Sequence, residues 1–470
     1  MFEQSAEAQV PVPFAGPGGG TAPLTWGQQA IMQDMRETGW THNVSGAHPV
    51  PAGVTVEQMA AQLSDLMSRH PALRMRLGVD DRGEPCQVVA AAGEMALDVV
   101  DVPDDADPAD VAKYAYELGH ARLLTHYDLY RDWSVRMAVI RHRGSLVHRV
   151  LTFDHLVVDG TATALLMADL GLVDLAARRT RDPRTVQILD LGRRERTPPL
   201  RAVSDRAVRY WESQLRSIPP LTFGEPTNPG GRHGRRFWHG RFSSPAAYLA
   251  VRAIARRTRT DTSRVLLAVI AVAIGRATGV SPLTAKLIVG NRFRPGFAEA
   301  IAPLSQNGVL TVDATDTTVD EVVTRARRAS VAAGMYAYYD PVQLAEVSSR
   351  LDEERGYPAR VTCRINDRRV VTRQAAEDGA RDERVTPEQI RRKAAETFLV
   401  WDGTLDHLHE QAFITVEDHP DTVFLQVIFD LACFTEGQVE ALLHGVEEVA
   451  VEAAFDPAAP TRVTPGSATG

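Results

Sequence analysis

An aspartate and a histidine, Asp154 and His155, stand side by side at the end of an apolar segment, in the stretch LTFDHLVVDG of residues 151–160. Histidine suits chemistry near neutral pH because its ordinary pKa of about 6.5 lets the imidazole accept or donate a proton there. A histidine at the end of a strand is more often structural, and the pair Asp159-Gly160 is common in turns. Two interpretations follow, a strand that ends in a turn or an active site around His155.

The neighbours of His155 favour the second interpretation. Adjacent strand residues point to opposite faces, so Asp154 is disfavoured as the carboxylate that orients His155, unless the strand has already ended. A buried Asp159 would need a cationic partner. Gly160 lets the main chain approach a substrate because it carries no Cβ atom. Strand parity alone does not decide which of the two side chains, His155 or Asp154, faces a cleft. If His155 faces it and acts, Asp154 points into the interior and supports it.

The elements that must position these residues can be predicted from apolar periodicity. The segments WSVRMAVI and SLVHRVLTF, joined by RHRG, predict a hairpin that leads into His155. The segment after Gly160 predicts a helix with Thr161 as a candidate cap. Further helices are expected within 25–80 and 108–124, in a pair over 248–278, and near the C-terminus, with strands between them. Alternating helices and strands in both halves predict an α/β architecture.

The composition of short segments suggests where the domains begin and end. Residues 1–20 and 456–470 are expected to be flexible tails, and 193–207 a linker, because it is charged and contains two consecutive prolines. The remaining ranges, 21–192 and 208–455, are then the N-terminal and C-terminal lobes.

Composition also limits the classes of partner and compartment. The chain has 470 residues, 44% of them hydrophobic, and a formal net charge of -8, which disfavours nucleic acid as the main partner. Three widely spaced cysteines form no disulfide framework, and the N-terminus lacks the pattern of a secretory signal. The longest apolar run, 265–275, is too short to cross a membrane and predicts a buried helix. We expect a cytoplasmic protein with no membrane partner.

Competing chemical signals are weaker. His407 and His409 in DHLHE could share one face of a strand as metal ligands, but no third ligand occurs at motif spacing, so we expect no metal. No P-loop and no GxSxG pattern is present, which disfavours a nucleotide hydrolase and a serine hydrolase.

The segment DHLVVDG resembles the His-His-x-x-x-Asp-Gly motif of the condensation-domain superfamily, which includes chloramphenicol-acetyltransferase-like acyltransferases. His155 matches the second His of the motif, Asp159 and Gly160 match its Asp and Gly, and Asp154 stands where the first His is usual. Other segments are similar to the family's in the expected order: PLTWGQQAI, RHPALRMRL and YDLYRDW in the first half, and YWESQL, LIVGNRFRP, IAPLSQNGVLTVD, YYDPVQL and FLQVIFD in the second.

The resemblance implies two chloramphenicol-acetyltransferase-like lobes in a V shape, with His155 at the floor of a tunnel between them. It implies that His155 positions or deprotonates an amine or hydroxyl that attacks an acyl thioester. It also implies that Asp159 is structural and paired with an arginine. Arg292 is the preferred partner, with Arg74 and Arg294 next.

The resemblance further implies an enzyme of natural-product biosynthesis, such as antibiotic or nonribosomal peptide synthesis, that forms an amide or ester. The protein itself would bind no cofactor, because the acyl group rides on the phosphopantetheine arm of a carrier protein. No adenylation or carrier segment occurs within the 470 residues, so we expect a stand-alone enzyme that meets its carrier in trans. Two alternatives stay open: a non-catalytic recruitment domain that binds a carrier protein or tailoring enzyme, and an acyltransferase that uses acyl-CoA.

Overall fold

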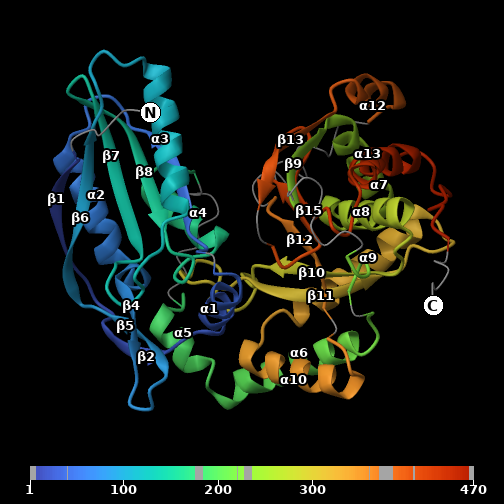
Figure 1. Ribbon diagram of the computed structural model, residues 1–470, viewed down its shortest axis with the longest axis horizontal. Helices are drawn as coiled ribbons and strands as arrows, with labels where there is room; N and C mark the ends of the chain where they lie inside the picture. Colours follow the sequence, from blue (N-terminus) through green and yellow to red (C-terminus); the bar gives the residue numbers. More distant parts are fainter. Residues whose placement is uncertain are drawn as a thin grey trace. The chain divides into compact units, whose positions relative to one another are not determined.

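The computed structural model describes residues 7–39, 41–174, 184–219, 221–226, 236–358, 360–369, 385–405 and 408–464 (Figure 1). The chain divides into two compact units. The first comprises Met1–Val203 together with Gly290–Gln306, and the second comprises Ser204–Val289 together with Asn307–Gly470.

A five-stranded sheet forms the centre of the first unit, in the order β1-β6-β7-β8-β3. Its strands are β1 (Glu7–Ala15), β6 (Ala92–Asp101), β7 (Val135–His142), β8 (Ser145–Phe153) and β3 (Val44–Pro49), and only β6 and β7 pair in parallel. Helix α3 (Pro108–Leu123) packs on the face that carries Val150. Helix α2 (Val56–Arg69) lies on the opposite face, where its Gln62 accepts a hydrogen bond from Arg149.

Smaller elements complete the first unit. A three-stranded sheet has the order β2-β5-β4. Helices occur between β2 and β4 and again after the motif. These elements are β2 (Gly20–Pro23), α1 (Trp26–Thr38), the 3-10 helix Pro71–Arg74, β4 (Met75–Val79), β5 (Pro85–Val89), α4 (Gly160–Asp169), α5 (Ile188–Arg194) and the first part of α6 (Pro198–Leu215).

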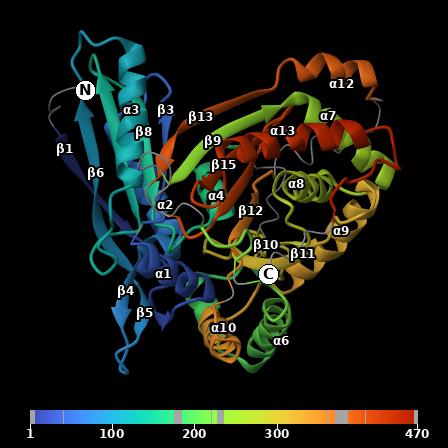
Figure 2. The same ribbon diagram turned by 45° about the vertical axis from the view of Figure 1, so that its right-hand side comes forward.

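The second unit is built on a seven-stranded sheet of order β11-β10-β12-β14-β15-β9-β13. Its helices α7, α8, α9 and α13 share one apolar core with the sheet, and α7, α8 and α13 lie side by side over it (Figure 2). Helices α6 and α10 pack against the other face at Val309. The bounds are β9 (Phe237–Ser244), α7 (Pro245–Thr258), α8 (Thr262–Thr278), β10 (Leu283–Val289), β11 (Gln306–Val312), α9 (Val319–Met335), α10 (Pro341–Arg355), β12 (Cys363–Asp367), α12 (Pro387–Ala394), β13 (Phe398–Leu405), β14 (Ala412–Glu417), β15 (Val423–Asp430) and α13 (Glu436–Ala453).

The hairpin expected before the motif is confirmed as β7 and β8. Arg143 and Gly144 form its turn with positive φ angles of 51° and 74°, the left-handed conformation that two-residue hairpin turns require. The long apolar run is confirmed as the buried helix α8, and no helix in the described ranges is long and apolar enough to span a membrane. The cap of α4 was assigned to the wrong residue, because the side chain of Asp159, not Thr161, accepts the hydrogen bond from the Ala162 N–H.

Both tail assignments were wrong for the residues that the structure describes. Residues Glu7–Ala15 form strand β1, which pairs with β6 along its whole length and buries Val12 and Phe14. At the other end, Val463 is buried and its carbonyl accepts a hydrogen bond from the Asp316 N–H. Residues 1–6 and 465–470 lie outside the described ranges.

The linker and the division into lobes also need correction. Residues 193–207 belong mostly to helices α5 and α6, and the two units divide between Val203 and Ser204, inside α6. The segment 290–306, which connects β10 to β11, belongs to the first unit. The chain thus comes back to the first unit after β10, so two contiguous residue ranges cannot describe the two units.

Candidate active site

The motif begins just after strand β8 ends at Phe153. Asp154 therefore stands outside the regular strand, and His155 follows in a turn. Asp154 is buried and His155 is half-buried, with its ring Nδ1 atom buried and without a hydrogen-bond partner among the described residues. The alternation of strand faces does not apply to this pair, but the two side chains still occupy different environments.

Asp154 supports the turn from the interior. One of its carboxylate oxygens accepts a hydrogen bond from the Leu156 N–H at 2.8 Å, and its own N–H donates to the Ser134 carbonyl at 3.0 Å. Burial raises the pKa of the Asp154 carboxyl, whereas the Leu156 hydrogen bond and the charges of His42 and Arg136 act in the opposite direction. This placement agrees with the expectation that the acid faces the interior of the unit.

His155 sits where its imidazole favours the neutral form. Burial lowers its pKa below the ordinary value, and the charge of His42 adds to that effect. Main-chain hydrogen bonding at His155 and Val158 and the negative charge of Asp159 oppose it. A neutral imidazole has a nitrogen lone pair that can accept a proton near neutral pH.

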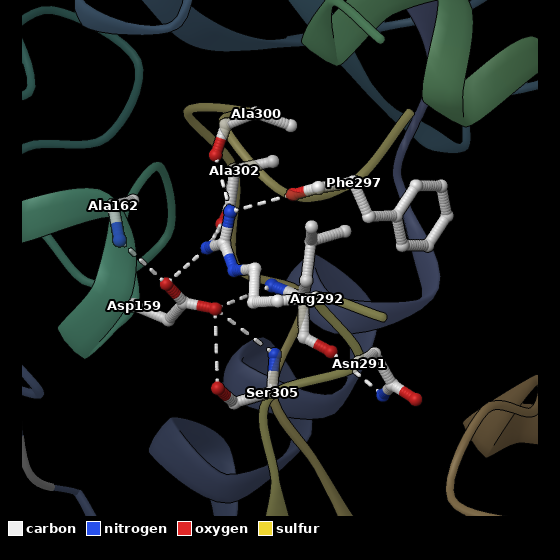
Figure 3. A network of polar contacts seen from close by, with 9 residues as sticks. Asp159, Ala162, Asn291, Arg292, Phe297, Ala300, Ala302 and Ser305 are labelled. Atoms are coloured by element: carbon white, nitrogen blue, oxygen red, sulfur yellow. Dashed lines mark hydrogen bonds and ion pairs between the residues drawn. The ribbon is translucent and has the colours of Figure 1, made fainter. Parts of the chain in front are cut away.

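Asp159 closes the motif as the centre of a polar network (Figure 3). Its side chain is 1% exposed. One carboxylate oxygen accepts from the Ala162 N–H at 2.8 Å and pairs with the guanidinium of Arg292. The other accepts from the Leu304 N–H at 3.1 Å and from the N–H and hydroxyl of Ser305 at 3.2 and 3.1 Å. Asp159 thus caps α4 and anchors the 290–306 segment.

Arg292 is held in turn by main-chain carbonyls of its own segment. It donates to the carbonyls of Phe297, Ala300 and Ala302 at 3.1, 2.6 and 3.2 Å (Figure 3). These bonds engage Nη1 and Nη2 of a largely buried guanidinium, whereas its Nε has no hydrogen-bond partner among the described residues. The ion pair expected between Asp159 and Arg292 is therefore present, within the first unit.

The two other candidate partners of Asp159 are engaged elsewhere. Arg74 is fully buried and donates to the carbonyls of Gly16 and Ala90, which joins the N-terminal segment to β5. Arg294 donates to the side chain of Asn291 at 3.1 Å. Among the arginines of the described ranges, Arg292 is the one that pairs with Asp159.

Gly160 occupies the first position of α4. A Cβ atom added there would meet no protein atom within 4 Å, and its φ is not in the left-handed region. The backbone geometry therefore does not require glycine. Because Gly160 has no side chain, the space beside the first turn of α4 stays open.

The structure brings together two residues that the sequence did not single out, His42 and Asp34. The His42 Nε2 atom lies 2.6 Å from an Asp34 carboxylate oxygen. The rings of His42 and His155 are 6.3 Å apart between centroids and mutually perpendicular. His42 belongs to no motif and is far from His155 along the chain, so only the fold reveals their proximity.

A metal site finds no support among the residues that can be placed. The described ranges contain no group of three or more histidine, cysteine or acidic side chains that could hold an ion. His407 lies outside these ranges. Glu410, from the same DHLHE stretch, is buried and pairs with Lys286 at 2.9 Å and with Arg364.

A known protein family matches a range of the chain that includes the motif. The family model of the Condensation domain matches residues 19–355, more than half of the chain. A relative in Salinispora arenicola, the probable non-canonical nonribosomal peptide synthetase CymA, is 26% identical over 335 residues, which are 68% of this chain and 4% of the synthetase. The chain spans only 2% to 4% of the length of CymA, kk1B of Curvularia clavata and the cyclosporin synthetase simA of Tolypocladium inflatum.

Solved structures share the fold. A condensation domain that mediates chain release from the enacyloxin polyketide synthase matches with a TM-score of 0.68 and 16% identity, over 97% of this chain and 85% of that one. The X-domain from teicoplanin biosynthesis matches with a TM-score of 0.64 and 18% identity, over 96% and 99%. A complex of that X-domain with OxyB is also similar, with a TM-score of 0.64, 18% identity and coverage of 95% and 96%. These likenesses confirm the chloramphenicol-acetyltransferase-like α/β fold expected from the sequence.

Proposed function

This chain belongs to the condensation-domain family, and on that basis we propose that it is an acyltransferase of natural-product biosynthesis. It joins the acyl group of a thioester to an amine or hydroxyl, forming an amide or an ester. The donor is carried on the phosphopantetheine arm of a carrier protein. The transfer needs no metal or resident cofactor, because the thioester already activates the acyl carbon.

The observation that supports this proposal is the state of His155. His155 is half-buried, and burial lowers its pKa, so the proton-accepting form prevails near neutral pH. In the proposed step the nucleophile attacks the thioester carbon and gives its proton to His155. The C–S bond then breaks, and the departing sulfur receives that proton as a thiol.

A defined reconstitution tests the proposal. The purified protein is incubated with an acylated carrier protein and, separately, with the corresponding acyl-CoA, each with a panel of amines and alcohols. Mass spectrometry follows the acyl group. We expect an amide or ester product from the carrier-bound donor, whereas product from acyl-CoA at equal or higher efficiency would support the CoA-dependent alternative.

A second candidate function is recruitment without catalysis. The observations that favour it are Asp154 in place of the first motif histidine and the likeness to an X-domain whose complex with OxyB has been solved. A recruitment domain would bind a carrier protein or a tailoring enzyme and leave the acyl thioester intact. Calorimetric binding of the carrier, together with no product from any nucleophile, would support this function over catalysis.

A further inference from the structure

A histidine outside the motif lies beside the proposed base. His42 follows helix α1, and its Nε2 atom is 2.6 Å from the carboxylate of Asp34 on that helix. Its ring stands edge-on to His155 at a centroid distance of 6.3 Å with an interplanar angle of 90°. Both histidines belong to the first unit. The motif carries one histidine, but the fold supplies a second.

The residues on either side of His42 are tied to the end of helix α3. The Thr41 hydroxyl donates to the Leu123 carbonyl at 3.3 Å. The amide of Asn43, which is 8% exposed, donates to the carbonyls of Thr125 and Arg122 at 2.6 and 3.3 Å. These bonds fix the backbone around His42, so its ring is held beside His155 by the fold.

Charge also links His42 to the two motif residues. The positive charge of protonated His42 lowers the pKa of both Asp154 and His155. The ion pair itself adds little to stability, because the side chains of His42 and Asp34 are each 33% exposed and such pairs contribute about 0 to 1 kcal/mol. The main effect of the pair of His42 and Asp34 is therefore on the protonation of His155, not on stability.

We propose that His42, oriented by Asp34, is a positioning residue for His155 and supplies the second imidazole of the reaction centre. The proposal rests on the proposed function. The edge-on contact fixes the plane of the His155 ring. When it is protonated, His42 weakens the hold of His155 on the proton taken from the nucleophile, which eases the transfer of that proton to the departing sulfur.

The ionisable groups that act on the two histidines come from several elements. They are Asp34 of α1 and Asp154 after β8, which act on His42, and Asp159 at the start of α4, which acts on His155. Arg136 of β7 acts on Asp154. Replacing His42 by a neutral residue removes its positive charge from the surroundings of His155. Because that charge lowers the pKa of His155, its loss should raise this pKa.

The direct test is a histidine titration by nuclear magnetic resonance on the full chain, with ¹⁵N in the imidazole rings. His155→Gln and His42→Gln assign the two signals. We expect His42→Gln to move the midpoint of His155 to higher pH. His419→Gln removes a histidine of the second unit that pairs with Asp421 at 2.9 Å, and it should leave the midpoint unchanged. An unchanged His155 midpoint in His42→Gln would overturn the proposal, whether or not the protein turns over a substrate.

Kinetics give an independent arm once a substrate pair is established. We expect His42→Ala to lower kcat by about tenfold, less than loss of the base itself. The side-chain amide of His42→Gln can donate to Asp34, so this variant should keep part of kcat, while the acid limb of the pH profile stays displaced to higher pH. A wild-type kcat and pH profile in both variants would overturn the positioning role. If no substrate is turned over while the titration shift is present, the proposed function fails and the coupling stands.

Discussion

At the scale of single residues, Asp159 makes more polar contacts than the other motif residues. Its two carboxylate oxygens accept from three main-chain N–H groups and one hydroxyl and pair with Arg292, so no charge is buried without compensation. The family motif implied the arginine, but no pattern in the sequence indicated Leu304 or Ser305. Main-chain N–H donors cannot be predicted from residue types, because every residue except proline carries one.

Replacement of Asp159 by alanine should destabilise the protein strongly. The substitution leaves Arg292 buried without its partner, which costs about 3 to 5 kcal/mol. Chemical denaturation should show a lower midpoint. Asp190→Ala removes a largely exposed partner of Arg193 and should shift the midpoint very little. Equal midpoints for the two variants would contradict the structural role of Asp159.

Asp154 should matter through its hydrogen bond more than through its charge. Asp154→Ala leaves the buried Leu156 N–H without an acceptor, at a cost of about 1 to 3 kcal/mol, and should lower turnover less than loss of His155 does. Asp154→Asn keeps an acceptor oxygen and should behave like the wild type. Asp154→His restores the residue usual in the family and should be tolerated. Thermal melts and kcat measure both effects, and loss of turnover in a stable Asp154→Asn would make the charge essential.

At the scale of elements, the periodic segments were predictable and the irregular ones were not. The hairpin before His155 and the buried helix α8 follow from apolar patterns. Strand β1 was missed because VPVPFA suggests a loop. Pro11 and Pro13 are two residues apart, so they leave hydrogen bonds missing on the same side of the strand, and β1 lies at the sheet edge where that is tolerated.

The C-terminal segment should contribute to the stability of the second unit. Val463 is 2% exposed, and its side chain packs beside Gly275 of helix α8. Val463→Ala should therefore cost about 1 to 3 kcal/mol and lower the denaturation midpoint. Val331→Ala, at a side chain that is 49% exposed on α9, serves as the matched control. A flexible tail, by contrast, would give the two variants the same midpoint.

At the scale of the whole molecule, the two-unit organisation was predictable but its boundaries were not. The sequence indicated two α/β lobes, whereas the segment 290–306 belongs to the first unit although it connects β10 and β11 of the second. Changes in composition along the sequence mark contiguous domains, so they cannot reveal a segment that belongs to an earlier unit. Of the two histidines of the proposed reaction centre, the sequence indicated only His155, because it lies in a motif and His42 does not.

The central claim is that His155 is the group that accepts the proton in acyl transfer. The most direct measurement is the rate constant for acyl transfer from an acylated carrier protein by the wild type and by His155→Ala, over a range of pH. Because burial lowers the pKa of His155, the acid limb of the wild-type profile should lie below the ordinary value of about 6.5. His155→Ala should fold normally and lose about a hundredfold or more in rate, without that limb. A full rate in His155→Ala would contradict the account.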